Sequence, residues 1–229
     1  MLFDTLRTIF SGGTVDLASI VMQILAVLFV IFCILPVHEY AHGKVALKLG
    51  DPTAKNMGRL TLNPLASIDP MGALFILLFG FGWAKPVMVD PRYFKKPKRD
   101  MALVSLAGPV SNLLAALAGA FVYNLILVIF KSVPLFIGIF FMYYIVINVS
   151  LAVFNLIPIP PLDGSKILAA FLPDRVLYKF YRYQNVFMMV LMLLLFSGIL
   201  DYPLSIFDSA VQTGVMWLAS LPFRLFGLF

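Results

Sequence analysis

Residues 17–49 read LASIVMQILAVLFVIFCILPVHEYAHGKVALKL, and this stretch decides what kind of fold the chain can adopt. Its first part, from Leu17 to Val37, is apolar and contains no charged residue. Because a helix needs about 20 apolar residues to cross the ~30 Å hydrocarbon core of a bilayer, this part is long enough to span a membrane. We predict a transmembrane helix that continues to Leu49 and ends at Gly-Asp-Pro, residues 50–52.

The composition of the whole chain is also that of a membrane protein. Hydrophobic residues make up 62% of the 229 residues and charged residues only 12%, whereas soluble domains have roughly half and a quarter. Three further apolar stretches are long enough to cross a bilayer, at about residues 101–130, 135–157 and 184–200. We therefore predict an all-α transmembrane bundle with about four membrane-spanning helices.

The region between the first two spans, residues 54–100, is expected to be partly re-entrant and partly extended. Its apolar stretch, residues 71–81, has about eleven residues and is too short to cross a bilayer as a helix, so we expect it to dip into the membrane and return. Residues 59–62 favour a short β-strand, residues 82–91 favour an extended conformation, and residues 92–100 form a charged loop.

The two ends of the chain flank this membrane domain. Residues 1–15 are expected to lie at the membrane surface, with a short amphipathic helix over residues 1–10. The last segment, residues 204–229, is apolar but interrupted by polar residues, and two alternatives stay open: it lies on the outer surface or crosses the membrane once more. No internal repeat is present, so we treat residues 1–229 as a single integral-membrane domain.

The positive charges of the chain lie between its apolar segments. Lys and Arg number 17 and Asp and Glu number 11, which gives a formal net charge of +6. Most of the cations fall into three groups, within residues 44–59, 85–99 and 166–182. If these groups share one face of the membrane, the positive-inside rule makes that face cytoplasmic. Because no nucleic-acid-binding motif is present, we interpret the basicity as membrane topology and expect no nucleic-acid partner.

One group of residues in the first span indicates specific chemistry: His38, Glu39 and His42 form the pattern His-Glu-x-x-His. Four residues of helix turn roughly 400°, so the two imidazoles lie on one face, about 6 Å apart in height, as two ligands of one zinc ion require. Glu39 points about 100° away from His38, which suits a general base that acts on water. These are the only histidines and the only glutamate of the chain. Because ionisable groups near lipid are costly, we expect function rather than a polar patch that ends the helix.

The third zinc ligand must be an aspartate or Cys33, because the chain has no further histidine or glutamate. Cys33 lies about 140° around the helix from His38 and faces away. Asp163 is the better candidate, because it follows the third span in NLIPIPPLDG, residues 155–164, where prolines and a glycine break the helix. The alternative is that Asp163 caps the helix that begins near Ser165.

Two motifs together resemble the site-2 protease family of intramembrane zinc metalloproteases: HEYAH at residues 38–42 and FNLIPIPPLDG at residues 154–164. Between them, GRLTLNPLASIDPMG, GFGWAKPV and SLAGPVSN resemble the compact prokaryotic branch, and the resemblance covers roughly residues 30–200. Many compact members have a histidine where this chain has Ser67, so we expect no metal or proton role at that position.

The resemblance implies a set of site residues. His38, His42 and Asp163 would bind Zn²⁺, and Glu39 would be the catalytic base. Asn155 corresponds to an asparagine of the family that is thought to hold the substrate carbonyl, and an amide aimed at a developing oxyanion is physically sensible. Helix capping or interhelical bonding is the alternative role of this asparagine. We also place Asn112, from SLAGPVSN, in the catalytic cavity, with packing between helices as the alternative.

The function implied is that of an intramembrane zinc endopeptidase, which hydrolyses peptide bonds in or near transmembrane segments of membrane proteins. The resemblance further implies regulated proteolysis in a prokaryotic cell membrane. His38 lies 22 residues after Asp16, or about 33 Å along a helix, so we expect the active site toward the cytoplasmic side. Two other functions stay open: a zinc-binding membrane transporter or sensor, and a non-catalytic scaffold. A transporter would need more ionisable residues along its path than these spans contain, and the intact Glu39 argues against a scaffold.

Overall fold

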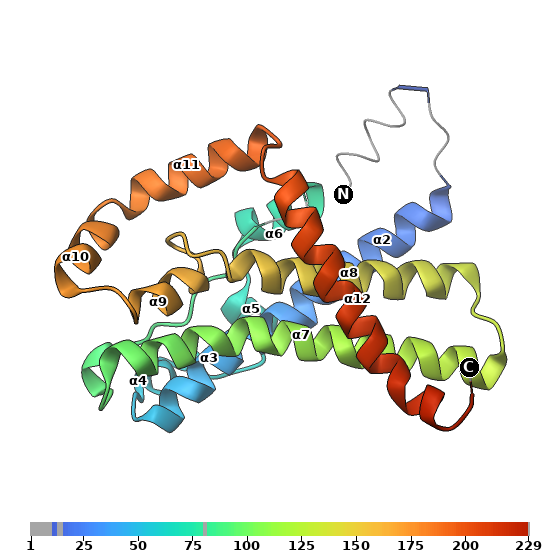
Figure 1. The fold of residues 1–229 in the computed structure, drawn as a ribbon, viewed down its shortest axis with the longest axis horizontal. Coiled ribbons are helices and arrows are strands. Elements are labelled where there is room, and N and C mark those ends of the chain that lie inside the picture. Colours follow the sequence, from blue (N-terminus) through green and yellow to red (C-terminus); the bar gives the residue numbers. More distant parts are fainter. Residues whose placement is uncertain (1–10, 13–15, 80–81, 229) are drawn as a thin grey trace.

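A computed structural model of the chain describes residues 11–12, 16–79 and 82–228, and within them it contains helices but no β-strand (Figure 1). Two short helices are of other types: η1, a π-helix at Val30–Ile34, and η2, a 3₁₀-helix at Pro91–Tyr93. The amphipathic helix predicted for residues 1–10 lies outside the described residues. The α-helices are α2 (Leu17–Phe29), α3 (Leu35–Leu49), α4 (Thr53–Asn56), α5 (Pro64–Ser67), α6 (Pro70–Phe79), α7 (Pro97–Phe130), α8 (Leu135–Asn155), α9 (Asp163–Ala169), α10 (Asp174–Arg182), α11 (Gln184–Phe196) and α12 (Asp201–Leu225).

The long helices confirm the predicted transmembrane bundle. α2, η1 and α3 follow one another as a helix from Leu17 to Leu49, and this helix, α7 and α8 are each long and apolar enough to cross a bilayer. α11 has only 13 residues, and α12, with 25 residues, is not apolar enough to cross a bilayer alone. The two helices meet the criteria for a span only as a pair, bent by 86° at their junction, and counted as one broken span they bring the number of spans to four. The chain is therefore an integral membrane protein.

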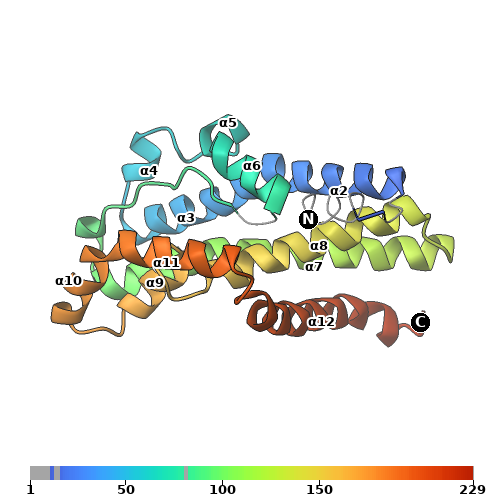
Figure 2. The ribbon, with the colours of Figure 1, turned by 90° about the horizontal axis from the view of Figure 1, so that it is seen from above.

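The helices are arranged in layers (Figure 2). α2 and α3 form one layer, α7 and α8 lie side by side in the next, and α12 crosses the other face of α7 and α8. Close contact within the middle layer depends on the small residues of α7, as a Cβ at Gly119 would lie only 2.3 Å from the ring of Tyr144 on α8. The Tyr144 hydroxyl donates to the carbonyl of Ala115, 3.1 Å away. Membrane helices use such small residues to bring their backbones together.

The first span changes its helical type just before the His-Glu-x-x-His motif. Pro36 has no N–H group and cannot donate to the carbonyl four residues earlier. The N–H of Leu35 donates to the carbonyl of Val30, which is five residues away rather than four. A π-turn of this kind inserts one residue into the helix and rotates the rest of the helix by roughly 100°. Gly50 then ends α3 with a φ of 112°, a left-handed conformation that glycine adopts easily, as the sequence predicts.

Residues 82–90, which we call the connecting segment, link α6 to η2 without regular secondary structure. The short strand that residues 59–62 favour is also absent from the described part of the chain. These residues do not pair as strands because their hydrogen bonds go to loop carbonyl groups and to side chains, and not to the backbone of a neighbouring strand. The N–H of Lys85 donates to the carbonyl of Ser67 at 2.8 Å, and the Arg59 guanidinium donates to the carbonyl of Lys85 at 2.7 Å.

Two further contacts fix the ends of the connecting segment. At its start, α6 passes the backbone of Trp83 at Gly72, where a Cβ would lie 1.9 Å from the Trp83 carbonyl oxygen, so a larger residue does not fit. At its end, the fully buried carboxylate of Asp51 accepts from the N–H of Asp90 at 2.8 Å and from the N–H of Thr53 at 2.9 Å. The segment is thereby attached to the end of α3, the helix that carries the motif.

Candidate metal centre

The His-Glu-x-x-His motif lies in the buried part of α3. His38, Glu39 and His42 are each less than 10% exposed. The Nε2 atoms of the two histidines are 3.1 Å apart, because residues four apart on a helix share a face. The sequence therefore predicts their convergence correctly.

Asp163, the first residue of α9, completes the cluster. Its Oδ2 atom lies 3.5 Å from His38 Nε2 and 3.1 Å from His42 Nε2. These three residues form a group whose ligand atoms all lie within 4.8 Å of one another. The other carboxylate oxygen of Asp163, Oδ1, lies 3.3 Å from the ammonium of Lys166, one helical turn along α9.

The outer nitrogens of both imidazoles bind to α7. His42 Nδ1 lies 2.7 Å from the carbonyl oxygen of Val104, and His38 Nδ1 lies 3.0 Å from Oδ1 of Asn112. Because carbonyl and amide oxygens only accept hydrogen bonds, both Nδ1 atoms carry the proton and both Nε2 atoms of the neutral rings present lone pairs. Partners of this kind commonly orient metal-binding histidines.

The donor set fits a zinc ion. When both rings are neutral and carry their proton on Nδ1, two nitrogen lone pairs and a carboxylate oxygen face one another at 3.1 to 3.5 Å. Such an arrangement is repulsive unless a cation lies among the three atoms. Two histidines and one carboxylate are also the protein ligands of many catalytic zinc sites, which keep a further position open.

A glycine of α7 provides the space for this cluster. A Cβ at Gly108 would lie 2.3 Å from His42 Nε2 and 2.5 Å from His38 Nε2. Val104, Gly108 and Asn112 are spaced by four residues and form one stripe along α7, which faces the two histidines. Neither Gly108 nor its immediate neighbours in the sequence indicate this contact with the histidines. The four-residue spacing of the stripe is the signal that points to it.

Glu39 faces the connecting segment. Its Oε2 atom accepts a hydrogen bond from the N–H of Val87 at 2.9 Å. This bond uses one carboxylate oxygen and holds the side chain beside the histidines. Glu39 thus links the motif helix to the segment that forms one wall of the adjoining cavity.

The cluster opens into a cavity of about 480 Å³. His38, Glu39, His42, Asp163 and Lys166 line it, together with Asn155 from the end of α8. The Asn155 amide donates to the Leu151 carbonyl at 2.9 Å. Most of the remaining lining residues are apolar, and many of them come from the connecting segment (Gly82, Trp83, Ala84, Pro86, Val87, Met88, Val89), from α8 (Leu151, Phe154) and from α11 (Met188, Leu191, Met192).

The remaining sequence candidates lie elsewhere. Asn112 is fully buried behind His38, contacts its ring and is not among the residues that line the cavity. Ser67 is buried, and its backbone carbonyl binds the connecting segment. Cys33 is exposed and is not part of the cluster of metal-ligand side chains.

Comparison with known proteins agrees with this site. Residues 131–198, which include Asp163, match the family described as Peptidase family M50. The chain is 40% identical over 191 residues to "Putative zinc metalloprotease YwhC" of Bacillus subtilis, and the match covers 82% of this chain and 87% of that protein.

Two more distant relatives carry similar names. "Putative zinc metalloprotease Rip2" of Mycobacterium tuberculosis is 32% identical over 77% of this chain and 68% of its own length. "Putative zinc metalloprotease MJ0611" of Methanocaldococcus jannaschii is 35% identical over 57% of this chain and 62% of its own length. No solved structure matches the chain. The chain therefore belongs to peptidase family M50, the site-2 protease family, and is a zinc metalloprotease.

Proposed function

We propose that this metalloprotease is an intramembrane endopeptidase that cleaves peptide bonds in or near transmembrane segments of other membrane proteins. One observation carries the proposal: the cluster of His38, His42 and Asp163 opens, next to Glu39, into a cavity with largely apolar walls between membrane helices. Such a cavity suits an apolar peptide better than a polar one. In this proposal the two histidines and the aspartate hold the zinc ion.

The proposed chemistry divides between the metal and Glu39. Bound zinc supplies a Lewis acid, which polarises the scissile carbonyl and makes water a better nucleophile. Glu39 takes the proton of the attacking water and returns it to the leaving amine. Its Oε1 atom performs this step, because Oε2 is held by the N–H of Val87.

Other residues prepare the site for this reaction. The carbonyl of Val104 and the amide of Asn112 keep the Nε2 lone pairs of the histidines directed at the cluster. Lys166 balances the charge on Oδ1 of Asp163. Asn155 lines the cavity and is the proposed hydrogen-bond donor to the oxygen of the scissile carbonyl. To donate to the substrate, its side-chain amide gives up its hydrogen bond to the Leu151 carbonyl.

A transmembrane substrate hides its peptide bonds in helical hydrogen bonds, so it must unwind before attack. We propose that the unwound substrate binds along the connecting segment by main-chain hydrogen bonds, in the manner of an added strand. Lys85 and Val87 already donate their N–H groups to the protein. In an extended chain, the backbone N–H groups of successive residues point to opposite sides, so the N–H of Met88 points away from the side to which Lys85 and Val87 donate. The backbone of Met88, whose side chain lines the cavity, is therefore the proposed contact.

The proposed orientation places the site toward the cytoplasm. Most cations of the three basic groups lie on α3, α4, the start of α7, α9 and α10, and these elements lie at the same end of the bundle (Figures 1 and 2). By the positive-inside rule this end is cytoplasmic. His38 lies 22 residues after Asp16, or about 33 Å along a helix, and so belongs near the basic end. From the family of the chain we infer regulated proteolysis of membrane proteins, and from its bacterial and archaeal relatives a prokaryotic cell membrane.

The test uses purified protein in liposomes with a tagged single-span peptide. Glu39→Gln is expected to lower turnover at least about 100-fold while the zinc content stays at the wild-type level, because general acid–base catalysis contributes at least that factor. Asp174→Asn is the matched control, since it makes the same chemical change at an exposed carboxylate and should leave turnover unchanged.

Three results would contradict the proposal. Equal turnover by wild type and Glu39→Gln would remove Glu39 from the reaction. Zinc binding without cleavage, together with zinc flux across the liposome membrane, would favour a transporter. Zinc binding with neither cleavage nor flux would favour a scaffold.

A further inference from the structure

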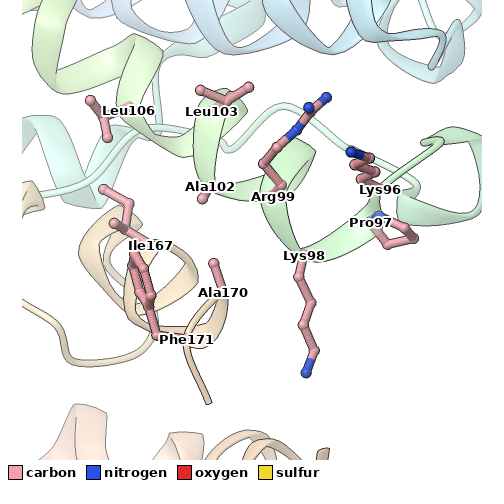
Figure 3. Close-up of a pocket in the computed structure, with 10 residues that line it drawn as sticks. All are labelled: Lys96, Pro97, Lys98, Arg99, Ala102, Leu103, Leu106, Ile167, Ala170 and Phe171. Atoms are coloured by element: carbon pink, nitrogen blue, oxygen red, sulfur yellow. The ribbon is translucent and has the colours of Figure 1, made fainter. Parts of the chain in front are cut away.

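An open cleft of about 740 Å³ lies between the start of α7 and α9, at the basic end of the bundle. Its floor and walls are apolar, and positive charges lie at one end (Figure 3). In Figure 3 the cationic side chains are on the right and most of the apolar ones are on the left. The residues that line it are Lys96, Pro97, Lys98, Arg99, Ala102, Leu103 and Leu106 from the α7 side and Ile167, Ala170 and Phe171 from the α9 side.

This cleft is separate from the metal cavity. Asp163 and Lys166 of α9 line the metal cavity, whereas Ile167, Ala170 and Phe171 line the cleft. The two sites share no lining residue. A ligand in the cleft is therefore not the substrate of the zinc site.

The cations of the cleft keep free hydrogen-bond donors. The Arg99 guanidinium binds Oδ1 of the buried Asp100 through two of its nitrogens, which leaves the third nitrogen available. The Lys98 ammonium donates to the Leu172 carbonyl at 2.9 Å and pairs with Asp174 at 2.7 Å, which leaves one of its three protons. Lys96 has no ion-pair partner within the part of the chain that the structure describes. An exposed pair such as Lys98–Asp174 is weak, so an anion can compete for it.

The start of α7 adds backbone donors at the same place. Pro97 is the first residue of the helix, and the side chain of the N-cap residue Lys96 makes no capping hydrogen bond. The carboxylate of Asp100, in the first turn, accepts from the N–H of Lys96 at 3.0 Å. The N–H groups of Lys98 and Arg99 belong to the first turn, where an α-helix offers no internal acceptor. The positive end of the helix dipole points the same way. The backbone N–H groups add hydrogen-bond donors to those of the three cations, while the buried Asp100 offsets part of the positive charge of this turn.

The apolar part of the cleft lies further along α7, toward the middle of this apolar span. Leu103 and Leu106 follow Arg99 by four and seven residues, or about 6 and 10 Å along the helix. They are 47% and 39% exposed, and Phe171 opposite them is 82% exposed. An occupant must therefore present negative charge at the membrane surface and apolar groups just below it.

We propose that this cleft binds an anionic glycerophospholipid. Its phosphate and acidic headgroup would lie against Lys96, Lys98 and Arg99, and the first part of its acyl chains would cover Leu103, Leu106 and Phe171. Basic pockets on the cytoplasmic side of membrane proteins bind acidic headgroups in this way. The acyl chains of a zwitterionic lipid contact the same apolar walls, but its headgroup has no net negative charge to balance the cations. The cleft should therefore prefer anionic lipids to zwitterionic ones.

The test titrates detergent-purified, zinc-loaded protein with dioleoylphosphatidylglycerol or dioleoylphosphatidylcholine and counts bound lipids by native mass spectrometry. Wild type is expected to bind the anionic lipid about tenfold more tightly. Lys96→Gln/Lys98→Gln should remove most of this preference, because each cation near a membrane surface contributes about a fivefold attraction for acidic lipid. Arg99 is kept, since the buried Asp100 depends on it.

Two further variants separate the cleft from general surface charge. Ala170→Trp fills the cleft without changing charge and should weaken binding of the anionic lipid about tenfold. Lys44→Gln/Lys48→Gln removes two cations at the same end of the bundle, outside the cleft, and should change the affinity less than about twofold. All variants should keep the zinc content and the thermal unfolding midpoint of wild type.

Several outcomes overturn the proposal. They are equal affinity of wild type for the two lipids, an equal loss in the Lys44/Lys48 control, and unchanged binding by Ala170→Trp. A labelled tetraglutamate peptide provides a last check. If it binds in dependence on Lys96 and Lys98 while the two lipids bind equally, the cleft takes an acidic protein segment and the lipid proposal is wrong.

Discussion

Gly108→Ala is predicted to weaken zinc binding selectively. A Cβ at this position would lie 2.3 Å from His42 Nε2 and 2.5 Å from His38 Nε2. Ordinary contacts of a Cβ begin near 3.4 Å, so the added methyl group overlaps both nitrogens by about 1 Å. A zinc–nitrogen bond is about 2.0–2.1 Å long. The methyl group therefore comes almost as close to the two nitrogens as the ion itself must.

The size of the effect follows from the cost of the overlap. Adding a methyl group to a tightly packed site costs about 1–3 kcal/mol. The overlap is relieved when the imidazoles of His38 and His42 move away from the cluster, so the cost should appear as lost zinc affinity. At 1.4 kcal/mol for each factor of ten, we expect a loss of about 5- to 140-fold.

The assay compares three glycine variants. Zinc affinity is measured by competition with a chromophoric chelator, and stability by thermal unfolding of the zinc-free protein. Gly119→Ala is the matched control: it lies about 16 Å further along α7, and its Cβ would lie 2.3 Å from the ring of Tyr144. It should lower the unfolding midpoint and leave zinc affinity unchanged. Gly214→Ala, whose Cβ meets nothing within 4 Å, should change neither.

Two results would refute this reasoning. If Gly108→Ala binds zinc as tightly as wild type, the metal does not lie between the histidines and α7. If Gly119→Ala loses zinc to the same extent, the loss reports general loosening of the bundle and not an overlap at the site.

Three other predictions rest on the contacts of single residues. Asn112→Ala removes the acceptor of His38 Nδ1 and should weaken zinc binding about 10- to 100-fold in the same chelator competition. Met88→Pro removes a backbone N–H from the connecting segment and should slow cleavage of a single-span peptide several-fold at unchanged zinc content; equal turnover would count against strand pairing. Asp51→Ala leaves two backbone N–H groups without their acceptor and should lower the free energy of unfolding by about 1–3 kcal/mol, measured by chemical denaturation.

Features that depend on neighbouring residues could be predicted from the sequence. The length of the apolar stretch at residues 17–37 is sufficient to predict a span, and the spacing of His38 and His42 is sufficient to place both rings on one face. Asp163 could be proposed because prolines break the helix before it, and such a break at membrane depth needs a polar cavity beside it. In these cases the deciding interactions are local.

Features that depend on distant residues could not be predicted in the same way. The partner of His42 Nδ1 is a backbone carbonyl 62 residues away, and a carbonyl carries no signal in the sequence. The strand favoured at residues 59–62 is absent because the Arg59 side chain binds carbonyl groups of residues 66, 85 and 86 instead. Propensity describes what a segment can form, whereas its hydrogen-bond partners decide what it does form.

The stripe on α7 shows how a local motif becomes a tertiary site. The chain order of the contacts is reversed between the two helices, because His42 meets Val104 and His38 meets Asn112, so α3 and α7 run antiparallel. The two histidines on α3 are four residues apart, and Val104, Gly108 and Asn112 on α7 have the same spacing. Because the spacings match, each ring meets its own acceptor on α7, and Gly108 lies between the two acceptors. The packing of α3 on α7 and the orientation of the zinc ligands therefore depend on the same contacts. A variant that loosens this stripe should lose zinc affinity before the rest of the bundle unfolds.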